Sequence, residues 1–143
     1  MTAQIETTNL LRIGVVVYDL DAKIKEYSRI YGITDWETGE HAPTDAIAHG
    51  RRTVATPGTW RSAVGTTPAV EGEQGPGGRP ASSLTFELIE PTGGESPFNE
   101  FLRTKREGIA FLQVRSTAAD EAAVAKHFES LGYDVAYLSL IPI

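Results

Sequence analysis

The sequence has no cysteine among its 143 residues. Disulfide bonds, thiolate nucleophiles and zinc–sulfur centres are therefore excluded. The absence of cysteine leaves the compartment open but is compatible with a reducing cytoplasm, where we expect the protein. Positive charge is scarce as well. The sequence has 13 Lys and Arg against 19 Asp and Glu, which gives a net charge of −6, and it contains no basic run. This balance argues against nucleic acid and against anionic membrane surfaces as partners.

Long apolar runs and recognised catalytic loops are also missing. No run approaches the roughly 20 apolar residues that span a bilayer, and residues 1–8 lack the basic start and apolar centre of a signal peptide. Gly75-Pro76-Gly77-Gly78 lacks the Lys-Ser/Thr of a phosphate loop, and no Gly-x-Ser-x-Gly elbow occurs. The surrounding segment 66–82 is rich in Gly, Pro and Glu, so we expect a mobile excursion between strands.

The remaining pattern is typical of one globular domain spanning 1–143. Residue patterns predict helices that follow Asp19 or Asp21 and end at Gly32, that cover 96–103, and that run from 118 to about 131 before Gly132. Strands are predicted at 10–17, 33–38, 59–64, 84–91, 108–115 and 134–140. Pro91 has no N–H to donate and is expected to end its strand, and segment 39–51 reads as irregular.

An internal repeat relates the two halves of the chain. Gly32 and Gly132 lie 100 residues apart, and each follows a strand and a helix of similar pattern. With one helix per unit, each sheet has one covered and one free face. Two such sheets side by side give an α+β fold with an open trough. The trough is expected to collect the less apolar side of the strands, namely Arg12, Thr85, Glu87, Phe111, Gln113 and Arg115.

Five stretches carry a further signal, namely Arg12 to Asp21, Arg29 to Ile33 with Trp36, Glu87 to Pro91, Phe101-Leu102 and Glu107 to Phe111. They resemble the vicinal oxygen chelate superfamily of glyoxalases, bleomycin-resistance proteins and extradiol dioxygenases. The stretches from Glu87 onward look closest to the methylmalonyl-CoA epimerase branch. The resemblance implies paired βαβββ modules at about 8–91 and about 107–143, joined by a linker helix at about 92–106. The second module is expected to be shortened.

The same resemblance implies a divalent metal in the trough, but most ligand positions differ here. Glu87 matches the carboxylate ligand, whereas Arg12 stands at the first His position and Ala110-Phe111 replaces a His-His pair. The chain stops near Ile143, and we expect it to fall short of the strand that carries the fourth ligand in the superfamily. A lone carboxylate beside a cationic Arg holds a divalent ion poorly. We therefore expect no metal in this site and no other cofactor.

An Arg–carboxylate pair could replace the bound cation, with Arg12 and Glu87 facing each other across the trough as the resemblance implies. In a structural interpretation, Arg12 only neutralises Glu87. In a functional one, Arg12 orients a substrate carboxylate or carbonyl and Glu87 acts as a base. In a third, both residues face solvent.

Other residues could complete the pocket. Trp60 is either a core residue or a pocket wall, and Phe111 is expected to fill space left by a lost ligand. Gln113 and Arg115 are either pocket donors or rim residues. The histidines are weaker candidates: His41 and His49 are expected in solvent, with a lid as the alternative, and His127 is expected to be structural.

These residues favour a metal-independent isomerase, epimerase or lyase that acts on a small carbonyl- or carboxylate-bearing molecule, with Glu87 as base and Arg12 as anion-binding group. The alternative is a non-catalytic protein of the bleomycin-resistance type that sequesters a small hydrophobic molecule. A shortened second module leaves an open sheet edge, so we also expect a homodimer that covers it.

Overall fold

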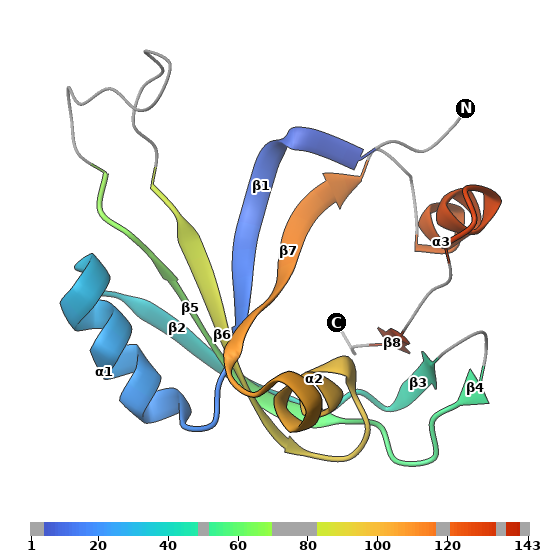
Figure 1. Cartoon of the computed structure of the whole chain (residues 1–143), viewed down its shortest axis with the longest axis horizontal. Helices are drawn as coiled ribbons and strands as arrows, with labels where there is room; N and C mark the ends of the chain where they lie inside the picture. Colours follow the sequence, from blue (N-terminus) through green and yellow to red (C-terminus); the bar gives the residue numbers. More distant parts are fainter. Residues whose placement is uncertain (1–4, 49–51, 70–82, 117–120, 134–136, 141–143) are drawn as a thin grey trace.

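The computed structural model describes residues 5–48, 52–69, 83–116, 121–133 and 137–140 (Figure 1). The predicted excursion at 66–82 therefore lies largely outside the described residues. The strands and helices are β1 (Ile5–Val16), α1 (Leu20–Tyr31), β2 (Trp36–His41), β3 (Asp45–Ala48), β4 (Arg52–Thr53), β5 (Thr59–Thr66), β6 (Thr85–Gly93), α2 (Pro97–Lys105), β7 (Gly108–Ser116), α3 (Glu121–Ser130) and β8 (Tyr137–Leu140). No helix in these ranges is long and apolar enough to cross a membrane.

The main sheet has five strands in the order β2-β5-β6-β1-β7. β1 and β6 are parallel, and the other three neighbouring pairs are antiparallel. β1, α1, β2, β5 and β6 together form one βαβββ unit, and β7 extends the sheet beyond β1 (Figure 1). The sheet is open and does not close into a barrel, so the predicted α+β class with an open sheet is confirmed.

A second, three-stranded sheet in the order β4-β3-β8 was not predicted. It contains Asp45–Ala48 and Arg52–Thr53, although the sequence pattern of 39–51 reads as irregular. β3 pairs with the distant β8, with Ile47 opposite Leu138. A four-residue strand has too few alternating positions to be recognised alone, because its stability depends on a partner that is remote in sequence.

Helix α1 begins and ends where the sequence predicts. The Asp19 side chain accepts a hydrogen bond from the N–H of Ala22, and Gly32 adopts a left-handed conformation with φ of 70°. Glycine carries no Cβ and is the residue that best tolerates this conformation, which stops the helix. Ile24 and Tyr27 then pack against the core of the sheet.

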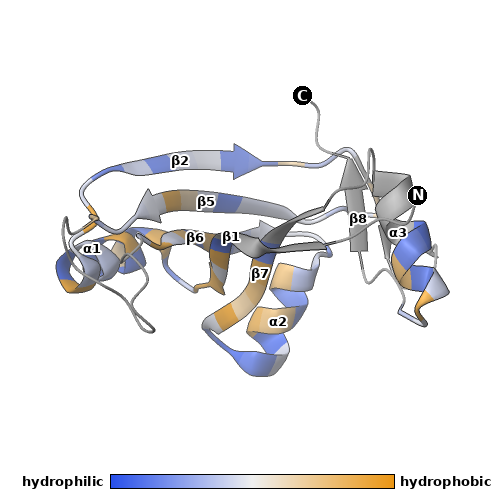
Figure 2. Ribbon diagram, turned by 90° about the horizontal axis from the view of Figure 1, so that it is seen from above, coloured by the Kyte–Doolittle hydropathy of each residue, from blue (hydrophilic) through white to orange (hydrophobic). Residues whose placement is uncertain are grey.

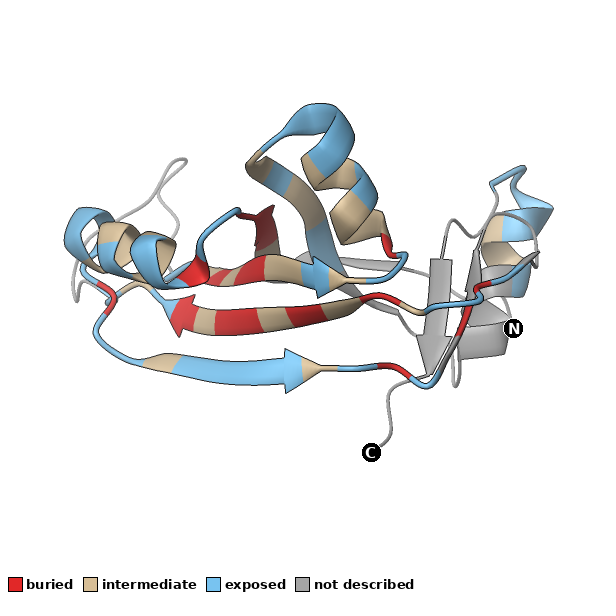
Figure 3. Cartoon of the chain, turned by 90° about the horizontal axis from the view of Figure 1, so that it is seen from below, coloured by how far each residue is buried: buried red, intermediate tan, exposed pale blue. Residues whose placement is uncertain are grey.

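The core lies between α1 and one face of the sheet, which we call the α1 face. Val15, Phe86 and Leu88 are buried there, and Ile13 packs beside them. Buried positions on β5 and β6 form the centre of the molecule in Figure 3. Because strand residues alternate, Arg12 and Glu87 point to the opposite face. The face assignment made from the sequence is confirmed for β1 and β6.

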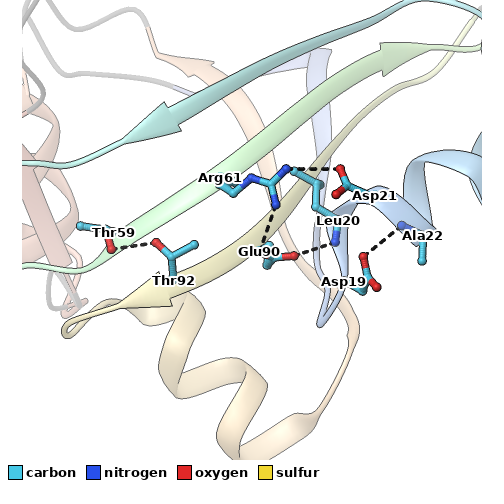
Figure 4. A network of polar contacts seen from close by, with 8 residues as sticks. All are labelled: Asp19, Leu20, Asp21, Ala22, Thr59, Arg61, Glu90 and Thr92. Carbon is cyan, nitrogen blue, oxygen red and sulfur yellow. Dashed lines mark hydrogen bonds and ion pairs between the residues drawn. The ribbon is translucent and has the colours of Figure 1, made fainter.

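The start of α1 is tied to the α1 face by charged groups (Figure 4). The Glu90 carboxylate accepts a hydrogen bond of 2.8 Å from the N–H of Leu20. Arg61 lies 3.5 Å from Glu90 and 3.2 Å from Asp21. A carboxylate at this end of a helix also interacts favourably with the helix dipole. Glu90 therefore anchors α1 to strand β6.

Two sequence predictions about strand ends and faces were wrong. β6 continues past Pro91 to Gly93, with Pro91 opposite Trp60 just before a register shift in β5. On β7, Leu112 was expected beneath the second long helix, but the residue is 61% exposed. Figure 1 shows α3 well away from β7. α3 lies near the second sheet, so the side of β7 that carries Leu112 is left uncovered.

Candidate functional site

The opposite side of the main sheet carries the predicted site residues, and we call it the α2 face because Phe98 of α2 contacts Trp60 and Phe111 on it. Strand register places Gly14 beside Phe111 on one side and Glu87 on the other. Val64 lies opposite Glu87 on the next strand. One transverse row thus runs from β7 through β1 and β6 to β5. The second row, one pleat away, contains Gln113, Arg12, Thr85 and Thr66.

Arg12 and Glu87 form an ion pair on this face. The Arg12 Nη1 atom donates a hydrogen bond to Glu87 Oε1 over 3.4 Å. This distance is long for a charge-assisted bond, which ordinarily measures about 2.7–2.9 Å. The Arg12 side chain is 39% exposed and that of Glu87 is 16% exposed. The two residues lie side by side on neighbouring strands, and do not face each other across a trough.

Threonine hydroxyls continue the polar row beside Arg12. The Oγ1 atoms of Thr66 and Thr85 lie 2.9 Å apart in a hydrogen bond, and Thr85 is half-buried. Gln113 lies opposite Arg12 on β7 and is exposed. Arg115 belongs to β7, but its side chain lies outside the described residues. The structure thus brings Thr85 and Gln113 to the two strands that flank Arg12.

Phe111 covers Gly14. Its ring occupies the space into which a Cβ on Gly14 would project. Gly14 is buried, and its missing side chain lets the aromatic ring lie directly on the backbone of β1. Phe111 therefore lines the row that contains Glu87, and it stands at the position where the resemblance implies a histidine ligand.

An aromatic series extends from Phe111 along the α2 face. Phe98 lies 5.8 Å from Phe111 and 5.0 Å from Trp60, measured between ring centroids, and Trp60 stacks on His41 at 5.5 Å. Trp60 is 7% exposed, so it is a core residue of this face. Aromatic pairs at these separations are favourable beyond their buried area.

The expectation that His41 lies in solvent was wrong. His41 is half-buried, and its Nε2 atom lies 2.8 Å from the Oγ of Ser62, which is 4% exposed. Sequence reasoning missed Ser62, although alternation within 59–66 places it on the same side as Trp60. His49 lies outside the described residues. His127 is half-buried and contacts Phe128, in keeping with a structural role.

A cavity of about 310 Å³ lies between α2 and β7. It is partly open to solvent, and the side chains that line it are all apolar: Pro97, Phe98, Phe101, Ala110 and Phe111. Figure 2 shows the apolar positions of α2 and β7 adjoining each other. Phe111 is both a wall of this cavity and the cover of Gly14, so the cavity adjoins the row that contains Glu87.

A second cavity of about 440 Å³ lies at the far side of the sheet, near the start of β2 and the end of β5. Val64 connects it to the same transverse row as Glu87. Its polar lining includes the carboxylates Asp35 and Glu37, which are both exposed. The α2 face thus has an apolar cavity at its β7 end, whereas the cavity beside β2 has carboxylates in its lining.

The residues present do not fit the divalent metal that the resemblance implies. Of the three implied ligand positions within the described ranges, only Glu87 offers a donor, and its carboxylate is paired with Arg12. Phe111 offers none. Across the described residues, no group of three or more His, Asp or Glu side chains is placed to hold a metal ion. We derive no chemical step through such an ion, and the absence of a cofactor stays a prediction.

This chain is similar to solved structures of methylmalonyl-CoA epimerases. A Streptomyces coelicolor methylmalonyl-CoA epimerase variant in complex with 2-nitronate-propionyl-CoA has a TM-score of 0.49 and 21% identity, over 86% of this chain and 71% of that one. A methylmalonyl-CoA epimerase in complex with methylmalonyl-CoA and NH4+ has a TM-score of 0.49 and 22% identity, over 86% and 69%. The methylmalonyl-CoA epimerase from Mycobacterium tuberculosis has a TM-score of 0.49 and 23% identity, over 87% and 65%.

No protein-family profile matches the sequence, and no curated protein matches it.

Proposed function

We propose that the α2 face is the active site of a metal-independent isomerase, epimerase or lyase acting on a small carbonyl- or carboxylate-bearing molecule. The observation that carries this proposal is the Arg12–Glu87 pair, which has a shielded carboxylate, a more exposed guanidinium and a long contact of 3.4 Å. Within the described ranges this is the one hydrogen bond of the Arg12 side chain. Further guanidinium N–H groups are therefore available to a ligand.

The proposed chemistry follows from the two charges. Arg12 binds the carboxylate or carbonyl oxygen of the substrate and stabilises the negative charge that develops on it. Glu87 removes a proton from the adjacent carbon, at the position where this charge makes the proton more acidic. In an isomerase the proton returns to a different atom of the substrate, and in an epimerase a proton from water is added to the opposite face of the same carbon. In a lyase the leaving group departs with the electron pair of its bond as a carbon–carbon double bond forms. Thr85 and Gln113 flank Arg12 and supply further hydrogen bonds to the substrate.

The alternative is a binding protein that sequesters a small hydrophobic molecule. One observation favours it specifically: the cavity between α2 and β7 has five apolar residues as its lining and no polar side chain among them. Such a cavity supplies affinity but no chemistry. Tight binding without turnover would be the expected behaviour.

Solvent exchange distinguishes the two functions. The protein is incubated in D₂O with a panel of small 2-oxo carboxylates that carry an acidic C–H bond, and deuterium incorporation is followed by NMR. We expect incorporation with the wild type, its loss in Glu87→Gln, and ligand affinity that survives this change. Glu40 is a matched control, because it is exposed on β2 opposite Arg61 and so points to the α1 face. Glu40→Gln should behave as wild type.

Binding without exchange in the wild type across the whole panel would favour sequestration instead. Exchange that continues unchanged in Glu87→Gln would leave the protein an enzyme but would reject Glu87 as its base.

We also propose that the protein is a homodimer. β7 is an edge strand of the main sheet, and Ile109 and Leu112 on it are 66% and 61% exposed. An edge with exposed apolar side chains is a ready surface for pairing with a second copy. Sedimentation at micromolar concentration should show a dimer that Leu112→Lys weakens, and a wild-type monomer would contradict the proposal.

A further inference from the structure

We propose that the cavity between α2 and β7 binds a ring-sized apolar substituent of the substrate, so that the substrate class is an aryl-substituted small carboxylic or oxo acid. This inference rests on the proposed function, because it takes Arg12 as the group that binds the carboxylate or carbonyl. It identifies the part of the substrate that Arg12 and Glu87 do not contact.

The cavity exists because of three local features. α2 begins at Pro97 and presents Phe98 and Phe101 toward β7. The pairing of β1 with β7 is irregular at this point, since Gly14 lies opposite Phe111 while Val15 lies opposite Ile109. Ala110 is thus the extra residue of a bulge, which re-aims side chains locally. Its small side chain leaves space that a larger residue would fill.

The cavity and the charged pair share a wall. Phe111 lines the cavity and lies on Gly14. Gly14 in turn lies between Phe111 and Glu87 in adjacent strand positions. Neighbouring strands are about 4.8 Å apart, so the row from Phe111 to Glu87 spans roughly 10 Å. A molecule with a carboxylate joined to a ring by a short chain matches this separation.

The size and lining of the cavity favour a ring over a polar group. An apolar cavity of roughly 150 Å³ is sufficient to bind benzene, and this one measures about 310 Å³. None of its five lining residues has a polar side chain to replace the hydration of a hydroxyl or a charge. Phe98, Phe101 and Phe111 offer aromatic surfaces, on which an aryl group packs edge-to-face or offset.

The experiment compares two carboxylates that differ in the ring. Propionate and 3-phenylpropionate are titrated into ¹⁵N-labelled protein, and Kd is measured from NMR shift changes. Burial of the ring should make 3-phenylpropionate bind about tenfold or more tightly than propionate. Ala110→Leu fills the cavity and should bring the ratio of the two affinities close to one. Phe101→Trp fills the cavity from the α2 side, and it provides the same test if Ala110→Leu does not fold.

The matched control is Thr104→Leu, which adds an apolar side chain at an exposed position of α2, outside the cavity. It should keep the full ratio of affinities. The inference is overturned if 3-phenylpropionate binds no more tightly than propionate in the wild type. It is also overturned if the ratio survives both cavity-filling changes.

Benzyl alcohol and Arg12→Gln separate this inference from the proposed function. Benzyl alcohol carries a ring but no carboxylate, so its binding should be lost in Ala110→Leu and kept in Arg12→Gln. Both carboxylates should bind more weakly in Arg12→Gln. If they do not, while benzyl alcohol still depends on Ala110, the cavity is supported as a ring site and Arg12 is rejected as the anion-binding group. If Arg12→Gln weakens both carboxylates but Ala110→Leu changes no affinity, the cavity inference fails and the proposed function survives.

Discussion

The ring of Phe111 lies against the backbone of Gly14, in the space that a side chain on Gly14 would need. This contact joins the edge strand β7 to the centre of the sheet. It also sets the boundary between the apolar cavity and the row that contains Glu87. A single pair of residues, one small and one large, thereby shapes both parts of the candidate site.

The first prediction tests this pair. Gly14→Ala should lower the free energy of unfolding by about 1–3 kcal/mol, the usual cost of forcing an extra group into packed structure. Gly14 is not among the glycines with positive φ, so the cost comes from the clash with the ring. In a Phe111→Ala background the same change should cost less than about 0.5 kcal/mol, because the ring is gone. Urea denaturation of the four proteins measures the coupling, and equal costs in both backgrounds would refute the contact.

Sequence patterns were sufficient where local rules dominate. Asp19 and Gly32 bracket α1 as expected, because caps act within a few residues. The alternation of Leu84 to Leu88 placed Phe86 under α1 and Glu87 on the other side. Arg12 and Glu87 could thus be assigned to one face from parity alone, before any pairing of strands was known.

Long-range partners were not predictable in the same way. His41 reads as a solvent residue in a polar segment, but β2 continues through it and brings it onto Trp60 and Ser62. The prediction that a helix covers Leu112 was wrong for a related reason. Its apolar neighbours fit a strand beneath a helix, and nothing in the local pattern reveals that α3 leaves this strand uncovered. Both errors concern which distant element covers a residue.

The second prediction concerns what the Arg12–Glu87 pair contributes to stability. A partly exposed ion pair with a long contact contributes little, so Arg12→Gln should change the free energy of unfolding by about 0–1 kcal/mol. The same change should weaken carboxylate binding several-fold, because the guanidinium is proposed to bind the ligand. Thermal unfolding and NMR titration with propionate test the two effects separately. A large loss of stability with unchanged binding would instead support the structural interpretation, in which Arg12 only neutralises Glu87.

The third prediction concerns the anchoring of α1. Glu90→Gln keeps an oxygen that can accept the N–H of Leu20 but loses the charge paired with Arg61. The change should lower the free energy of unfolding by about 1 kcal/mol, from the lost ion pair and the lost interaction with the helix dipole. Asp21 also contacts Arg61 but its side chain is 72% exposed, so Asp21→Asn should cost less than about 0.5 kcal/mol. Equal effects of the two changes, measured by urea denaturation, would contradict a special role for Glu90.

The fourth prediction is a pH dependence at Tyr27. Burial against the core, together with the neighbouring Tyr31, raises the pKa of the Tyr27 phenol above its ordinary value of 10.0. Its ring lies 5.2 Å from that of Tyr31 and 5.3 Å from that of Phe86, between centroids. Because the folded state holds this proton more tightly than the unfolded state, stability is intact below about pH 10 and falls as the pH rises through the raised pKa.

Tyr27→Phe removes this titration and keeps the aromatic ring in the core. The free energy of unfolding should therefore fall less between pH 9 and pH 11 in Tyr27→Phe than in the wild type, as measured by urea denaturation at each pH. Tyr18 is 57% exposed, so Tyr18→Phe is the matched control and should retain the wild-type slope. A slope in Tyr27→Phe as steep as that of the wild type would show that the phenol is not desolvated by the packing of α1 on β6.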